Sequence, residues 1–289
     1  MYSPPSAPLS IGGVIDEGLR LFRASFGRCW FLAIAPALIS TIYAIAFPVA
    51  LPSPAGLQSL SQLLTAVTPR ADALDVVVLL LSFIFQGAVI VTEIAIFRGD
   101  ESVTLRRALG TSVRRFPAML LGAILFFLLI GICAVPLGIA AVLFAAGETL
   151  SIAAALIALA ALSVGLWLWA RLQLWTVALF VEHVSATDAL ASSWRLTRAN
   201  WWRAAVIFTV AVIIVFVLTV VSYLGAVIAF LTHVSLSACM IVLQLCSLAS
   251  NAIYYPLGTA IWLAMYHDFT LRREGGDLAA RAGALSRVD

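Results

Sequence analysis

The sequence predicts an all-α, polytopic membrane protein with six transmembrane helices. Its composition is the first indication, because 63% of the 289 residues are hydrophobic and only 11% are charged, whereas about a quarter of the residues in a soluble domain are charged. The second is the length of the apolar runs. Several exceed the ~20 residues of a membrane-spanning helix, and they lack the alternation of a β-barrel strand. The third is a polar, arginine-bearing segment that recurs before each pair of apolar runs.

The recurring segment is most distinct at 185–203, SATDALASSWRLTRANWWR, and weaker copies occupy 11–28 and 98–115. The aligned apolar positions are Leu190, Trp194 and Trp201 in the third copy, Ile15, Leu19 and Phe26 in the first, and Leu105, Leu109 and Phe116 in the second. We therefore predict one membrane domain over 1–289, built of three parallel repeats, each an interfacial helix followed by a helical hairpin. The repeats are expected at 9–98, 99–182 and 183–270, with a cytoplasmic tail at 271–289.

The expected elements follow in chain order. Residues 1–9 are rich in Pro and Ser, and we expect them to be disordered. A kink is expected near Pro136, and the last span should be interrupted between Asn251 and Pro256. The loop 52–73 carries a further short apolar stripe. The six spans are expected at 29–51, 74–97, 116–146, 150–181, 204–231 and 236–266.

Each arginine-bearing segment has the pattern of a helix that lies in the headgroup plane; an ordinary amphipathic helix packed on protein is the alternative. Ser102 or Thr104 is expected to cap the second segment, and Ser185 with Asp188 reads as a capping box for the third. Arginine is attracted to anionic headgroups, and tryptophan is favoured at the membrane interface. The candidate headgroup contacts are therefore Arg20, Arg23, Arg28, Arg195, Arg198, Arg203, Trp194, Trp201 and Trp202.

The distribution of arginine predicts the topology. All 17 basic residues are Arg, and the three recurring segments and the tail hold 3, 5, 3 and 4 of them, whereas the loops on the opposite side hold only Arg70. The positive-inside rule then places both termini and every recurring segment in the cytoplasm. Because each repeat starts and ends on the same side, the repeats are parallel.

One arginine lies inside a span and is the main candidate for a functional site. Arg171 precedes Glu182 by 11 residues, so it lies roughly 16 Å deeper at the helical rise of 1.5 Å per residue. A charge inside the membrane is a functional-site hypothesis with a partner to be named. We expect that partner to be Glu93, the acid at a comparable depth, or a lipid phosphate. A purely structural Arg171–Glu93 pair that locks the bundle is the alternative.

Other kinds of chemistry lack a pattern in this sequence. No zinc-protease, nucleophile-elbow or phosphate-loop motif occurs, and the spacing of the four cysteines matches no zinc or redox motif. A net charge of +3 does not indicate a nucleic-acid footprint. We therefore predict no enzyme activity, no cofactor, no metal and no nucleic-acid partner.

The segment 171–203, RLQLWTVALFVEHVSATDALASSWRLTRANWWR, resembles the membrane domain attached to some glycerophosphoryl diester phosphodiesterases and the related YciC-like bacterial membrane proteins. The resemblance rests on Arg171, Glu182, Ala189, Leu190, Ser193, Trp194, Leu196 and Trp202, and the opening IGGVIDEGLRLFRASFGRCW is similar to the opening helix of that family. It implies six helices in a bacterial cytoplasmic membrane, and the family's membrane part has no assigned activity to carry over. The phosphodiesterase itself is a separate soluble barrel, which we do not expect in this chain.

Together these patterns predict a non-enzymatic integral membrane protein, lipid-interacting or accessory to the bacterial cell envelope. Its expected partners are membrane lipids, anionic ones above all, with a membrane protein or a second copy of the chain as further candidates. The alternative is a small transporter or lipid-translocating protein with an anionic-ligand site at Arg171. An intramembrane enzyme is a more distant alternative.

Overall fold

The structure is a computed structural model that describes residues 2–46, 73–100, 102–145, 148–231 and 236–285, and in these ranges every regular element is a helix. The loop 52–72 and the outer turn 232–235 lie outside them. The helices are α1 (Ile11–Ala46), α3 (Ala73–Phe97), α4 (Leu105–Gly131), α5 (Ala134–Ala145), α6 (Glu148–Leu172), α7 (Trp175–Val181), α8 (Ala186–Thr197), α9 (Trp201–Leu231) and α10 (Leu236–Leu285).

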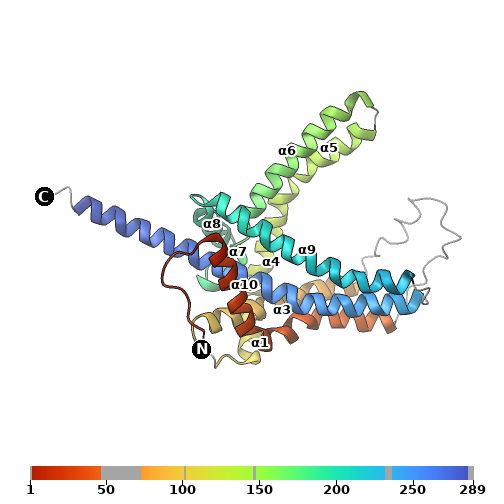
Figure 1. Cartoon of the computed structure of the whole chain (residues 1–289), viewed down its shortest axis with the longest axis horizontal. Coiled ribbons are helices and arrows are strands. Elements are labelled where there is room, and N and C mark those ends of the chain that lie inside the picture. The colour runs from red at the N-terminus through yellow and green to blue at the C-terminus, as the bar shows by residue number, and fades with distance from the viewer. Residues whose placement is uncertain (1, 47–72, 101, 146–147, 232–235, 286–289) are drawn as a thin grey trace.

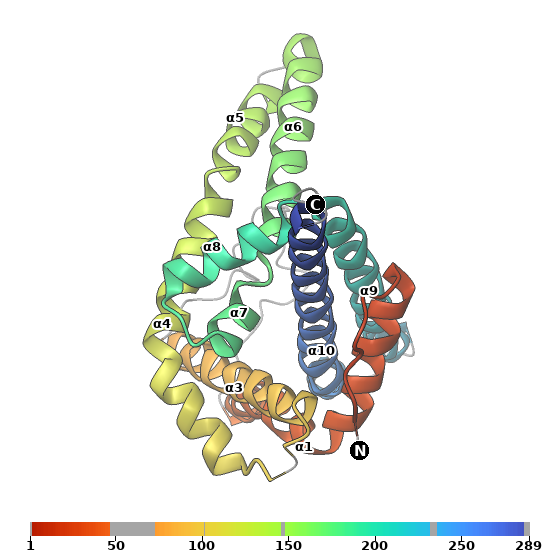
Figure 2. The ribbon, with the colours of Figure 1, turned by 90° about the vertical axis from the view of Figure 1, so that its left-hand side faces the viewer.

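Two parts of the molecule are distinct in Figure 1. Helices α1, α3, α9 and α10 run alongside one another as a bundle, in which α10 packs against α1, α3 and α9. Helices α5 and α6 form a hairpin that stands away from this bundle, and the short helices α7 and α8 lie where the two parts meet (Figures 1 and 2). The C-terminal part of α10 extends beyond the other helices.

The helices have the apolar surface of membrane spans. Five described stretches are long and apolar enough to cross a membrane: Ile11–Ile39, Val76–Phe97, Leu105–Phe144, Ser151–Val181 and Trp201–Val220. On the α5–α6 hairpin, Val142 is 70% exposed and Ile152 is 74% exposed. Such an apolar surface is costly in water and suits lipid. The chain is thus an all-helical protein with membrane-like helices.

The predicted interfacial helices are separate elements only in the third repeat. The first recurring segment continues without interruption into the first span as α1, although α1 bends along its course (Figures 1 and 2). The second continues into the third span as α4, through Pro117. Only α8 is separated from its span, by the turn at 198–200. Gly27 stands at the junction in α1, but the helix continues through it, so a polar and an apolar stretch join in one helix.

The kink expected near Pro136 is present, because the third span is interrupted at Ile132 and Cys133, one turn before this proline. Two other spans differ from the prediction. The fourth span breaks between Leu172 and Trp175 into α6 and α7. The last helix was expected to be interrupted before Pro256, yet α10 runs through it and on to Leu285, so the predicted tail is largely helical. A proline is tolerated in a helix whose freed carbonyls find other partners.

Both predicted capping sites are confirmed. The Thr104 side chain accepts a hydrogen bond from the amide of Arg107 at the start of α4. At the start of α8, the Ser185 Oγ accepts from the amide of Asp188 at 3.2 Å and donates to its carboxylate at 2.6 Å. These contacts satisfy backbone donors that the first helical turn leaves free.

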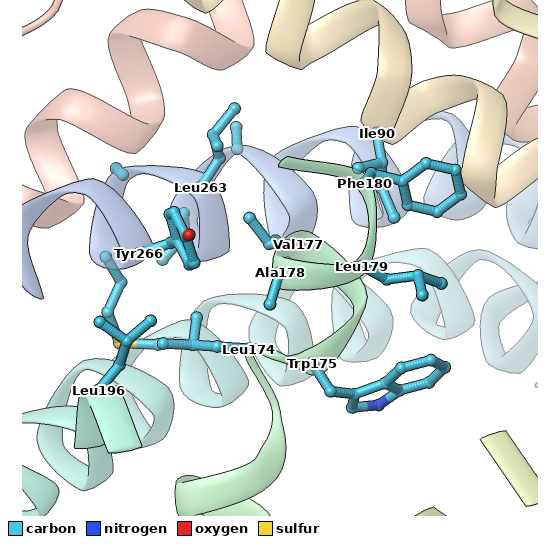
Figure 3. Close-up of a cluster of buried hydrophobic side chains, with 14 of the residues drawn as sticks. Ile90, Leu174, Trp175, Val177, Ala178, Leu179, Phe180, Leu196, Leu263 and Tyr266 are labelled. Carbon is cyan, nitrogen blue, oxygen red and sulfur yellow. The ribbon is translucent and has the colours of Figure 1, made fainter. Parts of the chain in front are cut away.

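The hydrophobic core is centred on α7 (Figure 3). Although α7 has only seven residues, Val177, Ala178, Leu179 and Phe180 are almost completely buried. Glycine permits this packing, since a Cβ on Gly122 of α4 would lie 2.4 Å from the Trp175 ring. The core therefore holds in place the junction between the bundle and the hairpin, where Arg171 lies.

Candidate anion site at the break between α6 and α7

The break between α6 and α7 leaves the Arg171 carbonyl without its helical partner. In a continuous helix the Arg171 carbonyl would accept from the amide of Trp175, but α6 ends at Leu172. Hydroxyls of α8 replace that bond: Ser193 Oγ donates to the Arg171 carbonyl at 2.8 Å, and Thr197 Oγ1, which also contacts the Ser193 carbonyl at 2.8 Å, lies 3.1 Å from the Arg171 carbonyl. Ser193 and Thr197 are four residues apart and so share one face of α8. These contacts attach α8 to the broken helix.

The Arg171 guanidinium lies against two tryptophans. Its central carbon is 4.0 Å from the centroid of Trp194 on α8 and 5.2 Å from that of Trp167 on α6. The two indoles meet edge to face, with centroids 5.5 Å apart. A cation over an aromatic face is stabilised by about 0.5–2 kcal/mol. The rings therefore fix the position of the guanidinium without neutralising its charge.

The guanidinium keeps hydrogen-bonding capacity that the protein does not use. Arg171 is 7% exposed, and its Nε and Nη2 are buried without a hydrogen-bond partner in the described part of the chain. Arg198 follows Thr197 at the C-cap of α8 and brings a second positive charge to this region. Buried polar groups are nearly always paired, so unpaired ones call for an explanation. A guanidinium with free donors is suited to an anion.

The predicted ion pair between Arg171 and Glu93 is wrong. Glu93 is fully buried on α3, where Ser25 of α1 donates to its Oε1 at 3.4 Å. No ion pair of the described residues includes either Glu93 or Arg171. The two residues were matched by depth, but depth does not determine the direction in which a side chain points. The break after Leu172 and the contact with Trp194 turn Arg171 toward α8.

Glu182 stabilises the turn between α7 and α8. Its Oε1 accepts from Ser192 Oγ at 2.5 Å and from the Tyr266 hydroxyl at 2.7 Å. Arg115 of α4 donates to the carbonyls of His183 at 2.9 Å and Val184 at 3.0 Å. His183 has a φ of 57°, in the left-handed region. These bonds connect α7 and α8 with α4 and α10.

The candidate headgroup contacts divide into two groups. Two of them have partners within the protein: Arg203 forms an ion pair with Asp268, and Trp194 packs on Arg171. The exposed candidates are Arg20, Arg23, Arg28, Arg195, Arg198, Trp201 and Trp202. Among them, Arg20 also pairs with Glu17 at 3.1 Å.

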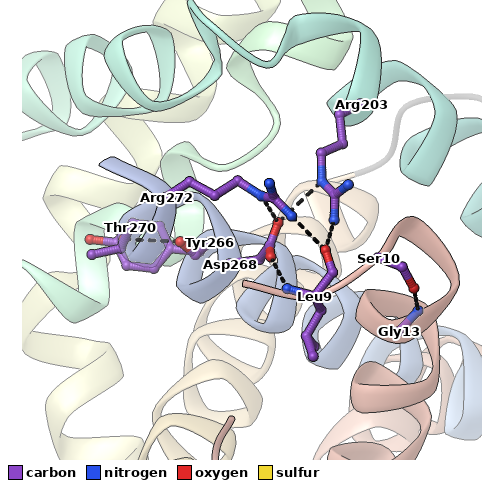
Figure 4. Close-up of polar contacts among 8 residues, drawn as sticks. All are labelled: Leu9, Ser10, Gly13, Arg203, Tyr266, Asp268, Thr270 and Arg272. Atoms are coloured by element: carbon purple, nitrogen blue, oxygen red, sulfur yellow. Dashed lines mark hydrogen bonds and ion pairs between the residues drawn. The ribbon is translucent and has the colours of Figure 1, made fainter. Parts of the chain in front are cut away.

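The N-terminal segment was expected to be disordered, but it is bound to α9 and α10 through Asp268 (Figure 4). This carboxylate is 1% exposed and accepts from the Leu9 amide at 2.7 Å, from Arg203 Nε at 3.2 Å and from Arg272 Nε at 2.9 Å. The Leu9 carbonyl accepts from both guanidiniums. His267 is hydrogen-bonded to the carbonyl of Pro5 at 2.9 Å. The sequence signal for this cluster is Asp268 with Arg272 at i+4, at the end of the last span.

Comparison with known proteins yields one match. A family model described as "Domain of unknown function (DUF7847)" matches residues 29–269. No curated protein and no solved structure matches the chain. No family of glycerophosphoryl diester phosphodiesterases and no YciC-like family is found.

Proposed function

The chain belongs to that family of unknown function, and we propose from its own residues that it is a non-enzymatic integral membrane protein that binds anionic lipid. The observation that carries the proposal is the Arg171 guanidinium, buried in a span with two nitrogens unpaired. The ligand we propose is the phosphate group of a lipid.

The energetics favour an external anion at this position. An arginine in mid-membrane costs roughly 2.5–3.5 kcal/mol on insertion scales. The contact with Trp194 offsets only about 0.5–2 kcal/mol of that cost. No carboxylate of the described residues pairs with Arg171. A phosphate accepts two parallel hydrogen bonds from one guanidinium, and Arg198 at the C-cap of α8 adds a second positive charge to this region.

The proposed setting is a bacterial cytoplasmic membrane that the chain crosses six times in three parallel repeats. The arginine asymmetry supports cytoplasmic termini, because 15 of the 17 arginines fall in the recurring segments and the tail. Exposed Arg195 and Arg198 of α8 then lie near headgroups, where each contributes about 1 kcal/mol of attraction to an anionic surface. Accessory contact with another envelope protein or a second copy fits the same setting.

The test compares lipid retention in three purified proteins. Arg171→Gln combined with Arg198→Gln removes both charges of the site, and Arg106→Gln removes one exposed charge of α4 as a matched control. Native mass spectrometry of protein purified from membranes containing phosphatidylglycerol should show anionic lipid bound to the wild type and the control. We expect the double variant to lose it. Equal retention in all three would overturn the proposal.

The alternative function is that of a small transporter or lipid-translocating protein. Arg171 lies in the last turn of α6, and its unpaired guanidinium nitrogens offer a binding position for an anionic headgroup inside a span. Reconstituted vesicles with fluorescent phosphatidylglycerol separate the two functions. Translocation that depends on Arg171 supports the alternative, whereas retention of lipid without translocation supports the first proposal.

A further inference from the structure

A second polar site lies inside the bundle, apart from Arg171. A cavity of about 240 Å³ opens between α1, α3 and α10. Polar side chains line part of its wall, although the surrounding helices are strongly apolar: Ser82, Gln86, Ser247, Asn251 and Tyr255. Since one water molecule occupies about 30 Å³ in the liquid, the cavity has room for several waters.

The faces of α1, α3 and α10 that line the cavity continue beyond it toward Glu93. On α3, Glu93 follows Gln86 by seven residues and the lining residue Val89 by four, so all three lie on one face. On α10, Thr259 follows the lining residue Tyr255 by four. On α1, Ser25 precedes the lining residue Leu32 by seven. Glu93, Ser25 and Thr259 therefore form the next layer below the cavity.

The carboxyl of Glu93 has few partners in this layer. It is fully buried, its Oε1 accepts from Ser25 at 3.4 Å, and its Oε2 has no hydrogen-bond partner. The Thr259 hydroxyl of α10 donates to the Tyr255 carbonyl at 3.0 Å instead, and the titratable neighbour on α1 is the buried Cys29. The residue of α4 that packs against this region is Ala108, which has no titratable group. No cationic side chain of the described residues forms an ion pair with Glu93.

A buried carboxylate must be neutralised, because burial of an unpaired charge costs several kcal/mol. Ca²⁺ and Mg²⁺ take six or more oxygen ligands, whereas this layer provides one carboxyl and two hydroxyls. A single proton neutralises the group and turns one oxygen into a donor. Proton uptake from hydronium in the cavity is balanced: the carboxylate becomes a carboxylic acid and hydronium becomes water.

We propose that Glu93 is an intramembrane proton-binding site that exchanges with water through the cavity between α1, α3 and α10. The polar groups Gln86, Asn251 and Tyr255 line the route of exchange. This site is separate from the proposed lipid site at Arg171. The charge of the Glu93 carboxyl, which is packed between α1, α3 and α10, then depends on whether water reaches it.

The first measurement is infrared spectroscopy of the full-length protein in lipid nanodiscs at neutral pH. Wild type should show a carbonyl-stretch band of a protonated carboxyl that is absent from Glu93→Gln. The matched control is Asp16→Asn, which removes an exposed carboxylate of α1 and should keep the band. Since glutamine imitates the neutral acid, Glu93→Gln should also fold. Identical spectra of wild type and Glu93→Gln would show an ionised Glu93 and overturn the proposal.

The second measurement tests the route and the identity of the cation. In D₂O the band should shift, and Ala37→Leu, which fills the cavity wall, should slow the shift several-fold. The same change at Ala141, an exposed position of α5, should leave the rate unchanged, and equal rates in both variants would refute exchange through the cavity. Loss of the band when NaCl replaces choline chloride would identify Na⁺ as the ligand and refute the proton site.

Discussion

Asp268→Ala should lower the free energy of unfolding by about 3 kcal/mol. The carboxylate is 1% exposed and accepts from one amide and two guanidiniums. Breaking a buried ion pair costs about 3–5 kcal/mol, since the remaining charges stay buried without a partner. Here the side chains of Arg203 and Arg272 are 17% and 30% exposed, so solvent screens them and we take the lower end of that range.

The assay is unfolding of the detergent-purified protein, followed by helical circular dichroism and compared with Asp16→Ala. Asp16 is an exposed aspartate of α1, and its removal should change stability by no more than about 0.5 kcal/mol. Asp268→Ala should also release the N-terminal segment to proteases, since Asp268 binds the Leu9 amide. A loss equal to that of Asp16→Ala would refute the proposed role of the cluster.

A double-mutant cycle separates the pair from other effects of the change. Arg203→Gln alone removes one partner of Asp268 and one donor to the Leu9 carbonyl. If the two residues stabilise each other, the loss in the double variant should be smaller than the sum of the single losses by about 1–3 kcal/mol. Additive losses would show that the two side chains act separately.

Three further changes have definite expectations. Gly122→Ala should lower the free energy of unfolding by about 1–3 kcal/mol through overpacking, because the new Cβ would lie 2.4 Å from the Trp175 ring. The control in the same unfolding assay is Gly131→Ala, because Gly131 has open space around it. Ser193→Ala combined with Thr197→Val removes both donors to the Arg171 carbonyl and should cost about 1–3 kcal/mol, and a loss no larger than that of either single variant would contradict this. The hydroxyl and amide of Ser102 hold the pKa of Asp100 below its ordinary value, so this turn should lose stability as pH falls below about 4. Hydrogen exchange at 102–105 should show that acid sensitivity in the wild type and not in Asp100→Asn.

The sequence alone determines the class of the protein and much of its local structure. Hydropathy and helical period are properties of single segments, so they predict membrane-like helices and the caps at Thr104 and Ser185 correctly. They also single out Arg171, because a charge in an apolar run is visible without knowledge of its neighbours. Hydropathy is insensitive to a change of helix direction, which is why the break after Leu172 was not predicted.

The partners of the polar groups were decided only by the tertiary structure. Depth in the membrane suggested that Arg171 pairs with Glu93, but the break after Leu172 and the packing of α8 turn the guanidinium onto Trp194. Arg203 looked like a headgroup contact, yet it meets Asp268, a residue 65 positions away. A side chain's partner depends on how its helix is rotated about its own axis and on which helices pack beside it. Those quantities arise from contacts between distant segments, and no local pattern of residues contains them.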